Sequence, residues 1–377
     1  MAENERYIAL YRRFRPETFD EVLGQEHVVR VLKHQIQTGS VGHAYLFSGT
    51  RGTGKTTMAR LLAKGVNCLM GGDGPVPPSG VLRPCGICAN CIAVKNGALV
   101  DVIEIDAASN NGVEDVRDLR DSIIYPPAAA RKKVFIIDEV HMFSKAAFNA
   151  LLKTLEEPPE HILFILCTTE PGKLPQTILS RCLKFDFRRV PMARIAEGIA
   201  GICAKIGIAI TDDAAALIAA NADGSVRDGL SILEQCVQAG EQTITREFVL
   251  EIVGSPGDES IAELTGHVAS GDAAAALVRL DAMLADGMDE KRIMDDWIEW
   301  LRSALLIKFV ADPERILNRS AENIAAIAKQ GAAYETAFIN EAIYTLAKLR
   351  NEARWSSSVR ILFEMAIIEM SERKKDN

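Results

Sequence analysis

The first half of the chain alternates short apolar runs with segments whose apolar positions recur every three or four residues. The runs are of strand length and mostly uninterrupted, which is typical of parallel strands buried on both faces. They lie at residues 45–47, 99–105, 134–137, 162–167 and 184–187. With the helical segments between them, they predict an α/β fold, with a parallel sheet and flanking helices.

Helical spacing is clearest in the segments that separate these runs. Residues 26–38 carry an apolar stripe that ends at Gly39, and residues 144–157 end before two prolines. Another helix begins at Thr56, and a further stripe covers residues 113–123. These helices are expected to pack on the sheet.

Beyond Pro191 the pattern is helical. The clearest stripe, residues 293–305, contains aromatic and Met side chains, which favours a core or a subunit interface over a cofactor site. The last helices carry no candidate chemistry, so we expect them to serve assembly. The predicted domains are an α/β domain at residues 1–190, a helical lid at 191–254 and a helical domain at 255–377.

Composition narrows the class of protein. The 377 residues are 48% hydrophobic and 25% charged, with a net charge of −8, as in an ordinary protein of more than one domain. No segment approaches the roughly 20 apolar residues of a membrane helix, and residues 1–6 lack the apolar core of a signal peptide. We expect a soluble cytoplasmic protein with no membrane partner. A local groove for nucleic acid is still compatible with the negative charge.

A glycine-rich stretch between the first run and the helix after it is the main candidate for chemistry. Residues 49–57 fit the pattern G-x-x-x-x-G-K-[ST] at every specified position. Backbone N–H groups can converge on phosphate where no Cβ intervenes, and the helix directs its positive dipole end at the same anion. Lys55 would contact the β- and γ-phosphates, and Thr56 would contact Mg²⁺. A turn that binds nothing is the alternative. The candidate nucleotide contacts are Gly49, Thr50, Gly52, Thr53, Gly54, Lys55, Thr56 and Thr57.

Two acids follow the third run. A buried parallel strand would deliver Asp138 and Glu139 to the edge where nucleotides bind. Asp138 would hold Mg²⁺ through water, and Glu139 would act as the general base that activates the attacking water. Thr169 follows the next run, where it could reach the γ-phosphate or that water. His141 is interpreted as a packing or hydrogen-bonding residue without a chemical role.

Four cysteines surround a Gly- and Pro-rich insertion at about residues 68–91. Cys85, Cys88 and Cys91 have the spacing of a metal knuckle, and Cys68 is the fourth candidate ligand. Four thiolates suit a structural, tetrahedral Zn²⁺ site. Free thiols and an iron–sulfur cluster are the alternatives.

Two arginines have positions that need an explanation. Ser225 is a natural helix N-cap, which leaves Arg227 in the first turn, where a cation opposes the helix dipole. This placement favours an anion facing Arg227. Arg181 lies in a short predicted helix at residues 175–182. Without further information, either arginine would be interpreted as a surface ion pair.

At this point the motifs resemble those of a known family, the gamma/tau subunits of bacterial DNA polymerase III, which are AAA+ ATPases of the sliding-clamp loader. The resemblance spans Tyr7 to Asp228 and is specific, because the cysteine knuckle is not general among AAA+ proteins. The matching segments are residues 11–16, 22–27, 49–57, 85–91, 138–142, 149–159 and 180–182.

The resemblance implies roles that spacing alone does not assign. Thr169 would be sensor 1, and Arg227 would be sensor 2 in the lid. Arg181 would act in trans as an arginine finger in the neighbouring subunit's site. The N-terminal arm, with Tyr7, Tyr11 and Pro16, and Val22 after it, would line the adenine pocket.

The resemblance also implies a function and partners. ATP, Mg²⁺ and structural Zn²⁺ would be bound, and ATP binding and hydrolysis would open a ring-shaped sliding clamp and load it on primed DNA during replication. The partners would be copies of the same chain and delta and delta-prime-type subunits in a pentamer, acting within the polymerase holoenzyme in the nucleoid-associated cytoplasm. Residues 109–112 carry no basic side chain, so the salt dependence of DNA binding should be shallow.

Three other functions are alternatives to this one. A signalling GTPase would need an [NT]-K-x-D motif after the acidic strand, which is absent there. A non-hydrolysing structural arm of the loader conflicts with the intact Lys55, Thr56, Asp138 and Glu139. Another DNA-directed AAA+ motor, for branch migration or helicase action, would share the ATPase core but lack the cysteine knuckle.

Overall fold

A computed structural model describes residues 8–70, 84–112, 119, 121–253, 258–311, 313, 316, 317, 321–353, 355, 356 and 358–372. Tyr7, the Gly- and Pro-rich stretch from residue 71, most of the stripe at 113–123 and the last five residues lie outside that range. The chain divides into two compact units. The first contains residues 1–202 and 221–234, and the second contains residues 203–220 and 235–377.

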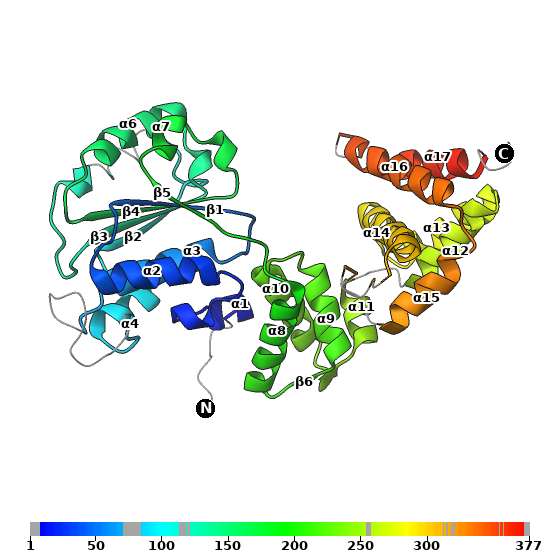
Figure 1. Cartoon of the computed structure of the whole chain (residues 1–377), viewed down its shortest axis with the longest axis horizontal. Helices are drawn as coiled ribbons and strands as arrows, with labels where there is room; N and C mark the ends of the chain where they lie inside the picture. Colours follow the sequence, from blue (N-terminus) through cyan, green and yellow to red (C-terminus); the bar gives the residue numbers. More distant parts are fainter. Residues whose placement is uncertain are drawn as a thin grey trace. The chain divides into compact units, whose positions relative to one another are not determined.

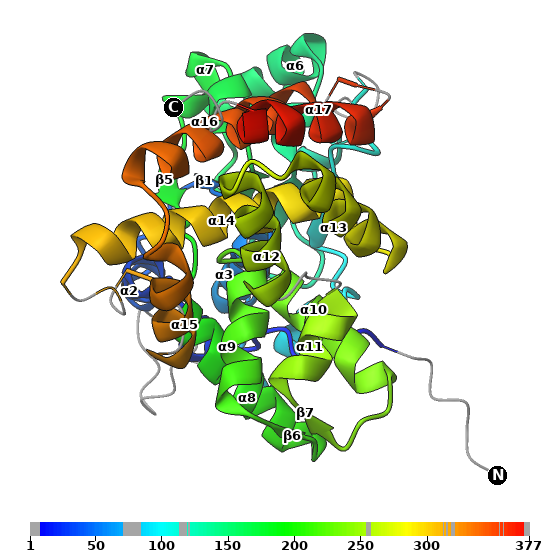
Figure 2. The ribbon, with the colours of Figure 1, turned by 90° about the vertical axis from the view of Figure 1, so that its right-hand side faces the viewer.

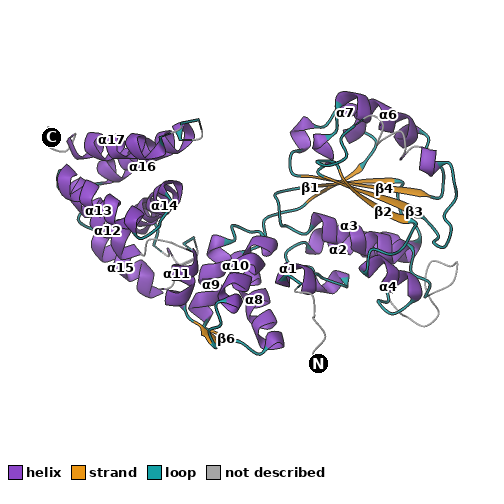
Figure 3. Ribbon diagram, turned by 180° about the vertical axis from the view of Figure 1, so that it is seen from behind, coloured by secondary structure: helices purple, strands orange, loops and turns teal. Residues whose placement is uncertain are grey.

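The first unit is built on a five-stranded parallel sheet, as predicted (orange in Figure 3). The strand order is β2-β3-β4-β1-β5, so β1 lies between β4 and β5, and β3 lies one strand further along. Parallel strands bring their carboxyl ends to one edge of the sheet. The strands are β1 (Ala44–Ser48), β2 (Val102–Asp106), β3 (Lys133–Asp138), β4 (Ile162–Thr168) and β5 (Leu183–Asp186).

Strand β2 is shorter than the apolar run that predicted it, because Asp101 precedes it with another role. The Asp101 carboxylate accepts backbone hydrogen bonds from Ala128, Ala129 and Ala130 at 2.7–2.8 Å. Because the Asp101 side chain binds this loop, β2 begins only at the next residue, Val102.

Helices cover both faces of this sheet (Figure 1). One face packs against α2 (Glu26–Thr38) and α3 (Lys55–Val66), and the other packs against α6 (Lys145–Glu156) and α7 (Gln176–Leu179). Side chains alternate along β1: Tyr45 and Phe47 belong to the α2–α3 core, whereas Ala44 and Leu46 belong to the other. The central strands β1, β3 and β4 are buried on both faces and are therefore almost continuously apolar, whereas β2 and β5, at the two edges of the sheet, are partly exposed and contain charged residues.

Several of the other elements before residue 254 are short. The N-terminal arm forms two small helices, and a two-stranded parallel ladder interrupts the helical region after residue 191. The other described elements before residue 254 are α1 (Leu10–Arg13), η1 (Phe19–Glu21), α4 (Ala89–Lys95), η2 (Val140–Met142), η3 (Pro171–Lys173), α8 (Met192–Ile206), β6 (Ala209–Ile210), α9 (Asp212–Asn221), α10 (Val226–Gln238), β7 (Thr243–Ile244) and α11 (Arg246–Val253).

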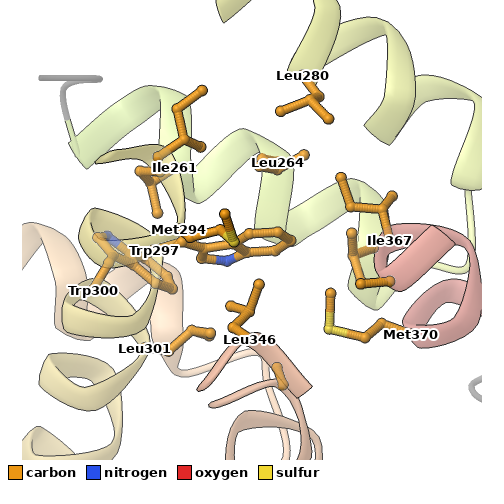
Figure 4. Packing of buried hydrophobic residues seen from close by; sticks show 14 of the residues in the cluster. Ile261, Leu264, Leu280, Met294, Trp297, Trp300, Leu301, Leu346, Ile367 and Met370 are labelled. Atoms are coloured by element: carbon orange, nitrogen blue, oxygen red, sulfur yellow. The ribbon is translucent and has the colours of Figure 1, made fainter. Parts of the chain in front are cut away.

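The second unit contains the C-terminal helices, and α14 packs against α15 and α16 (Figure 2). The predicted aromatic stripe forms its core. Trp297 is fully buried at the centre of the side chains in Figure 4, and its indole N–H donates to Thr265 Oγ1 at 2.8 Å. No helix among the described residues is long and apolar enough to span a bilayer. The helices are α12 (Asp258–Ala269), α13 (Ala273–Ala285), α14 (Glu290–Phe309), α15 (Ala321–Gly331), α16 (Thr336–Glu352) and α17 (Val359–Glu372).

Candidate nucleotide and metal sites

The glycine-rich loop connects β1 to α3 and is packed so tightly that a side chain cannot replace two of its glycines. Gly52 has a φ of +77°, and a Cβ built on it would lie 1.8 Å from Ser225 Oγ at the start of α10. A Cβ on Gly49 would lie 2.4 Å from the Phe187 carbonyl oxygen. The loop backbone therefore follows a path that only glycine permits, with its N–H groups at the N-terminus of α3.

Lys55 is the first residue of α3 and is only 5% exposed. Its ammonium group donates to the carbonyl oxygens of Gly49 and Thr50 at 2.7 and 2.8 Å. Burial lowers the pKa of Lys55, and the nearby Glu139 charge partly opposes that shift. Thr53 Oγ1 also donates to the Thr50 carbonyl, at 2.8 Å. The cation is thus held against the loop backbone that would surround a phosphate.

The two residues predicted to hold Mg²⁺ are in direct contact. Thr56 Oγ1 donates to Asp138 Oδ2 at 2.7 Å, which joins the start of α3 to the end of β3. A hydroxyl and a carboxylate oxygen at this separation fit the oxygen ligands of Mg²⁺, either directly or through water. Thr57, the next residue of the motif, is half-buried in the first turn of α3.

Glu139 has a left-handed backbone, with φ 47° and ψ 43°, which is unusual for a residue other than glycine. Its Oε2 atom accepts hydrogen bonds from the Thr169 hydroxyl at 2.9 Å and from the Thr169 backbone N–H at 3.3 Å. Both residues line a cavity of about 480 Å³. The other lining residues are Thr50, Arg51, Ala108, His141 and Met142.

His141 was not predicted to belong to this cavity. Its Nδ1 atom lies 3.1 Å from Thr168 Oγ1 and 3.4 Å from Glu139 Oε2. The chain position two residues after Glu139 was the available signal. It was insufficient, because the contact depends on η2 turning the histidine back toward the end of β4.

Arg227 lies in the first turn of α10, where the sequence placed it. Ser225 caps that helix by accepting the Asp228 N–H at 3.2 Å, and the Arg227 guanidinium lies 4.8 Å from the centre of the Tyr11 ring. Arg15, half-buried nearby, was not predicted. Burial and then the Arg60 charge lower its pKa. The cluster of cations beside the glycine loop favours an anionic ligand.

The other predicted nucleotide residues make different contacts. Arg181 follows α7, and its guanidinium donates to Thr177 O at 2.8 Å and to Glu156 Oε1 at 2.6 Å. Val22 is buried in the core shared with α2 and α3, and Pro16 is half-buried. Arg181 therefore belongs to the α6–α7 face of the sheet.

The four predicted cysteine ligands converge beyond the far end of α3. Their sulfur atoms lie within 4.8 Å of one another, and Cys85 and Cys91 are 3.9 Å apart. Four sulfurs at about 2.3 Å from a tetrahedral Zn²⁺ lie about 3.8 Å apart, so the donor set fits this metal. Burial raises the pKa of Cys91, which is a cost that a bound cation would offset. For Cys88, burial also raises the pKa, but the N–H groups of Cys91 and Leu69 outweigh it and lower the value to about 6.

A buried amide joins the cysteine cluster to the sheet. Asn67 Oδ1 accepts the N–H groups of Arg131 and Lys132 at 3.1 and 2.8 Å, and its Nδ2 donates to Lys132 O at 2.9 Å. The Asn90 side chain in α4 donates to Asn67 O at 3.0 Å. These bonds tie α3, α4 and the start of β3 together next to Cys68.

Family comparisons agree with this arrangement. Residues 24–191 match the family model of DNA polymerase III, delta subunit. Residues 194–242 match the ATPase lid domain of DNA polymerase III clamp loader subunits, and residues 244–375 match domain III of DNA polymerase III subunits gamma and tau.

Among solved structures, similarity is low. The Thermotoga maritima RuvB Holliday junction branch migration motor is 20% identical over 73% of this chain and 86% of its own, with a TM-score of 0.47. A Bacillus subtilis DNA clamp loader delta protein is 13% identical over 91% of this chain and 99% of its own, with a TM-score of 0.36.

Curated relatives are much more similar. DNA polymerase III subunit tau of Bacillus subtilis is 42% identical over 97% of this chain and 63% of its own length, and that of Escherichia coli is 42% identical over 80% and 46%. The chain thus spans about half to two thirds of the length of these relatives. DNA polymerase III subunit gamma of Buchnera aphidicola is 42% identical over 68% of this chain and 67% of its own. The chain therefore belongs to the family of DNA polymerase III gamma and tau subunits.

Proposed function

We propose that this chain is an ATP-hydrolysing motor subunit of a bacterial DNA polymerase III clamp loader, in which ATP binding and hydrolysis open a sliding clamp and load it on primed DNA. The observation that carries the proposal is the set of residues that meet at the carboxyl ends of the strands. There the glycine loop with Lys55 and Thr56 meets Asp138, and Glu139 and Thr169 share a cavity beside the loop. Family membership favours clamp loading over branch migration as the use of this ATPase core.

Each residue has a physical task in the proposed reaction. The loop N–H groups, Lys55 and Arg227 bind the phosphates, Thr56 and Asp138 would hold Mg²⁺, and Tyr11 and Val22 border the base. Bound Mg²⁺ supplies charge compensation on the phosphates. Glu139 orients the attacking water and accepts its proton, and Thr169 contacts the γ-phosphate or that water.

Assembly completes the site in this proposal. Arg181, held by Glu156 on the α6–α7 face, is assigned to a neighbouring subunit's nucleotide. The partners are copies of this chain, delta and delta-prime-type subunits in a pentamer, the clamp and primed DNA. The proposed place of action is the nucleoid in the cytoplasm.

The proposed domain organisation is an α/β domain at residues 1–190, a lid at 191–254 and a helical oligomerisation domain at 255–377. Structural Zn²⁺ is assigned to Cys68, Cys85, Cys88 and Cys91, and the fit of the four sulfurs to a tetrahedral metal supports this assignment.

The proposal is tested by substituting the general base in the reconstituted complex. Glu139→Gln should bind ATP with wild-type affinity and lose turnover by at least about 100-fold, because the amide cannot accept a proton. Turnover is measured as phosphate release with clamp, primed DNA and partner subunits present, and affinity with a fluorescent ATP analogue.

Glu160→Gln is the matched control. Glu160 is exposed and precedes β4, so it lies at the amino ends of the strands, opposite the glycine loop. It should hydrolyse ATP at the wild-type rate. Normal turnover by Glu139→Gln would remove Glu139 as the base, and a wild-type complex without ATPase activity would remove the proposed function.

A further inference from the structure

His141 contacts several residues of the proposed hydrolytic site without having a role in it. Its side chain is 7% exposed, and the residue lines the cavity with Glu139 and Thr169. Nδ1 lies 3.1 Å from Thr168 Oγ1 and 3.4 Å from Glu139 Oε2, whereas Nε2 lies 3.5 Å from Glu170 Oε1. A histidine that only fills space does not need carboxylates near both nitrogens.

Thr168 constrains the ring further. Its hydroxyl oxygen accepts the Glu170 N–H at 3.0 Å and has one proton to donate. If that proton goes to an unprotonated Nδ1, the ring turns a lone pair toward Glu139 Oε2. If Nδ1 carries the proton, the N–H faces both Thr168 Oγ1 and Glu139 Oε2. Only the second arrangement attracts the carboxylate.

Thr169 is the other group that holds Glu139, and it has two tasks. Its hydroxyl and its N–H both donate to Glu139 Oε2. In the proposed function, the same hydroxyl contacts the γ-phosphate or the attacking water once ATP is bound. Glu139 then loses one of its two donors at the moment when its position matters most.

We propose that His141 is a positioning residue, which replaces the Thr169 hydroxyl as a donor to Glu139 when nucleotide binds. This inference rests on the proposed role of Glu139 as general base. His141 Nδ1–H keeps the carboxylate at the cavity edge beside Thr168, and Nε2 faces Glu170, which is paired with Lys173 at 2.8 Å. The histidine acts through Glu139 and does not itself touch the substrate.

Two amide substitutions distinguish the ring nitrogens. His141→Asn places an amide near the position of Nδ1, and His141→Gln places one near Nε2. His141→Asn should stay within about threefold of the wild-type kcat, whereas His141→Gln and His141→Ala should lose kcat roughly 30-fold, a loss typical of removing a residue that orients a functional group. KM for ATP and the Kd of an ATP analogue should not change, because the phosphate contacts are intact.

A double substitution separates positioning from a structural effect. In a Glu139→Gln complex, adding His141→Ala should reduce the residual rate no further, since the carboxylate that His141 positions is gone. His161→Ala is the matched control. His161 is also half-buried, but its Nε2 lies 3.2 Å from Ile123 O at the other end of β4, so kcat should be unaffected.

Several results would overturn the inference. Wild-type kcat in His141→Ala, equal losses in His141→Asn and His141→Gln, or the same fold loss in the wild-type and Glu139→Gln backgrounds would each reject it. A raised Kd for the ATP analogue would show that His141 serves binding instead. If Glu139→Gln retains turnover, the base assignment fails and this inference fails with it, which is a different pattern from a failure of His141 alone.

Discussion

The two ends of helix α3 serve different purposes, although twelve residues of one helix connect them. At the N-terminal end, glycines with left-handed backbone and a partly desolvated ammonium group surround a space next to a cavity. At the C-terminal end, Asn67 has its side-chain oxygen and nitrogen bonded to the start of β3, and Cys68 joins three other thiols. The N-terminal end keeps backbone N–H donors for a ligand. At the C-terminal end, the polar groups of Asn67 are already paired within the protein.

This difference indicates that the C-terminal end of α3 contributes mainly to stability and the N-terminal end mainly to ligand binding. A backbone donor left for a ligand contributes little to folding, whereas a buried donor with a fixed partner is costly to leave alone. Substitutions near Cys68 and Asn67 should therefore lower the free energy of unfolding more than nucleotide affinity. Substitutions in the glycine loop should affect both, because the loop also packs on Ser225.

Loss of the proposed Zn²⁺ from the cysteine cluster should have the largest effect on the stable end. A ligand present at about 1,000 times its Kd stabilises the folded state by about 4 kcal/mol, and that amount should be lost in Cys88→Ser. The measurements are metal content per chain by mass spectrometry and the free energy of unfolding in urea.

Cys182→Ser is the control for this prediction, because Cys182 lies outside the cluster, after α7. It should retain a full complement of metal. A wild-type protein purified without metal, or Cys88→Ser of unchanged stability, would mean that the four thiols are not a structural site.

At the ligand end, Gly52→Ala should cost about 3 kcal/mol of unfolding free energy. The substitution combines a strained left-handed backbone with a Cβ only 1.8 Å from Ser225 Oγ, so α10 or the loop must shift. Nucleotide affinity should fall as well. Chemical denaturation and titration with an ATP analogue measure the two effects.

Gly97→Ala, just after α4, provides the comparison. Gly97 also has a positive φ, of +67°, but nothing lies within 4 Å of an added Cβ. It should cost about 1 kcal/mol from backbone strain alone, with unchanged nucleotide affinity. Equal costs at the two glycines would show that the contact with Ser225 is unimportant.

Asp101 should give the stability of the fold a pH dependence. Burial raises the pKa of this carboxyl, but the N–H groups of Ala129, Ala128 and Ala130 outweigh it and hold the pKa below its usual value. A lowered pKa stabilises the fold above the unfolded-state value of about 3.9 and loses this contribution as pH falls through the folded-state value.

Asp101→Asn removes the titrating group and keeps the shape. It should be about 2 kcal/mol less stable than wild type at pH 7, and the difference should shrink as the pH falls below about 4. Urea denaturation from pH 7 to pH 3 measures it. A difference that is constant over this range would contradict the role of the charge.

The sequence predicted the features that depend on local pattern. The strands, the glycine loop, helix α2 up to Gly39 and the Ser225 cap each follow from residues close together in the chain. The cysteine cluster also follows from spacing, except that Cys68 had to be inferred from its position before the insertion.

What was missed depends on contacts between distant segments. His141 reaches Thr168 from a different element, and Asp101, just before β2, binds a loop nearly thirty residues later. The ladder of β6 and β7 joins two dipeptides that are too short to give a periodic signal. Pattern within one segment does not encode such pairings, because each partner is unremarkable alone.

The order of the strands also determines when, during synthesis of the chain, β1 can pair with its neighbours in the sheet. The ribosome releases β1 and the glycine loop early, but the neighbours of β1 in the sheet are β4 and β5, which end at residues 168 and 186. Until they emerge, β1 exposes a strand that is fully buried in the folded protein, whereas β2 and β3 can already pair with each other. The nascent chain should therefore gain nucleotide affinity only after β4 is made, and chains stalled before that point expose an aggregation-prone edge.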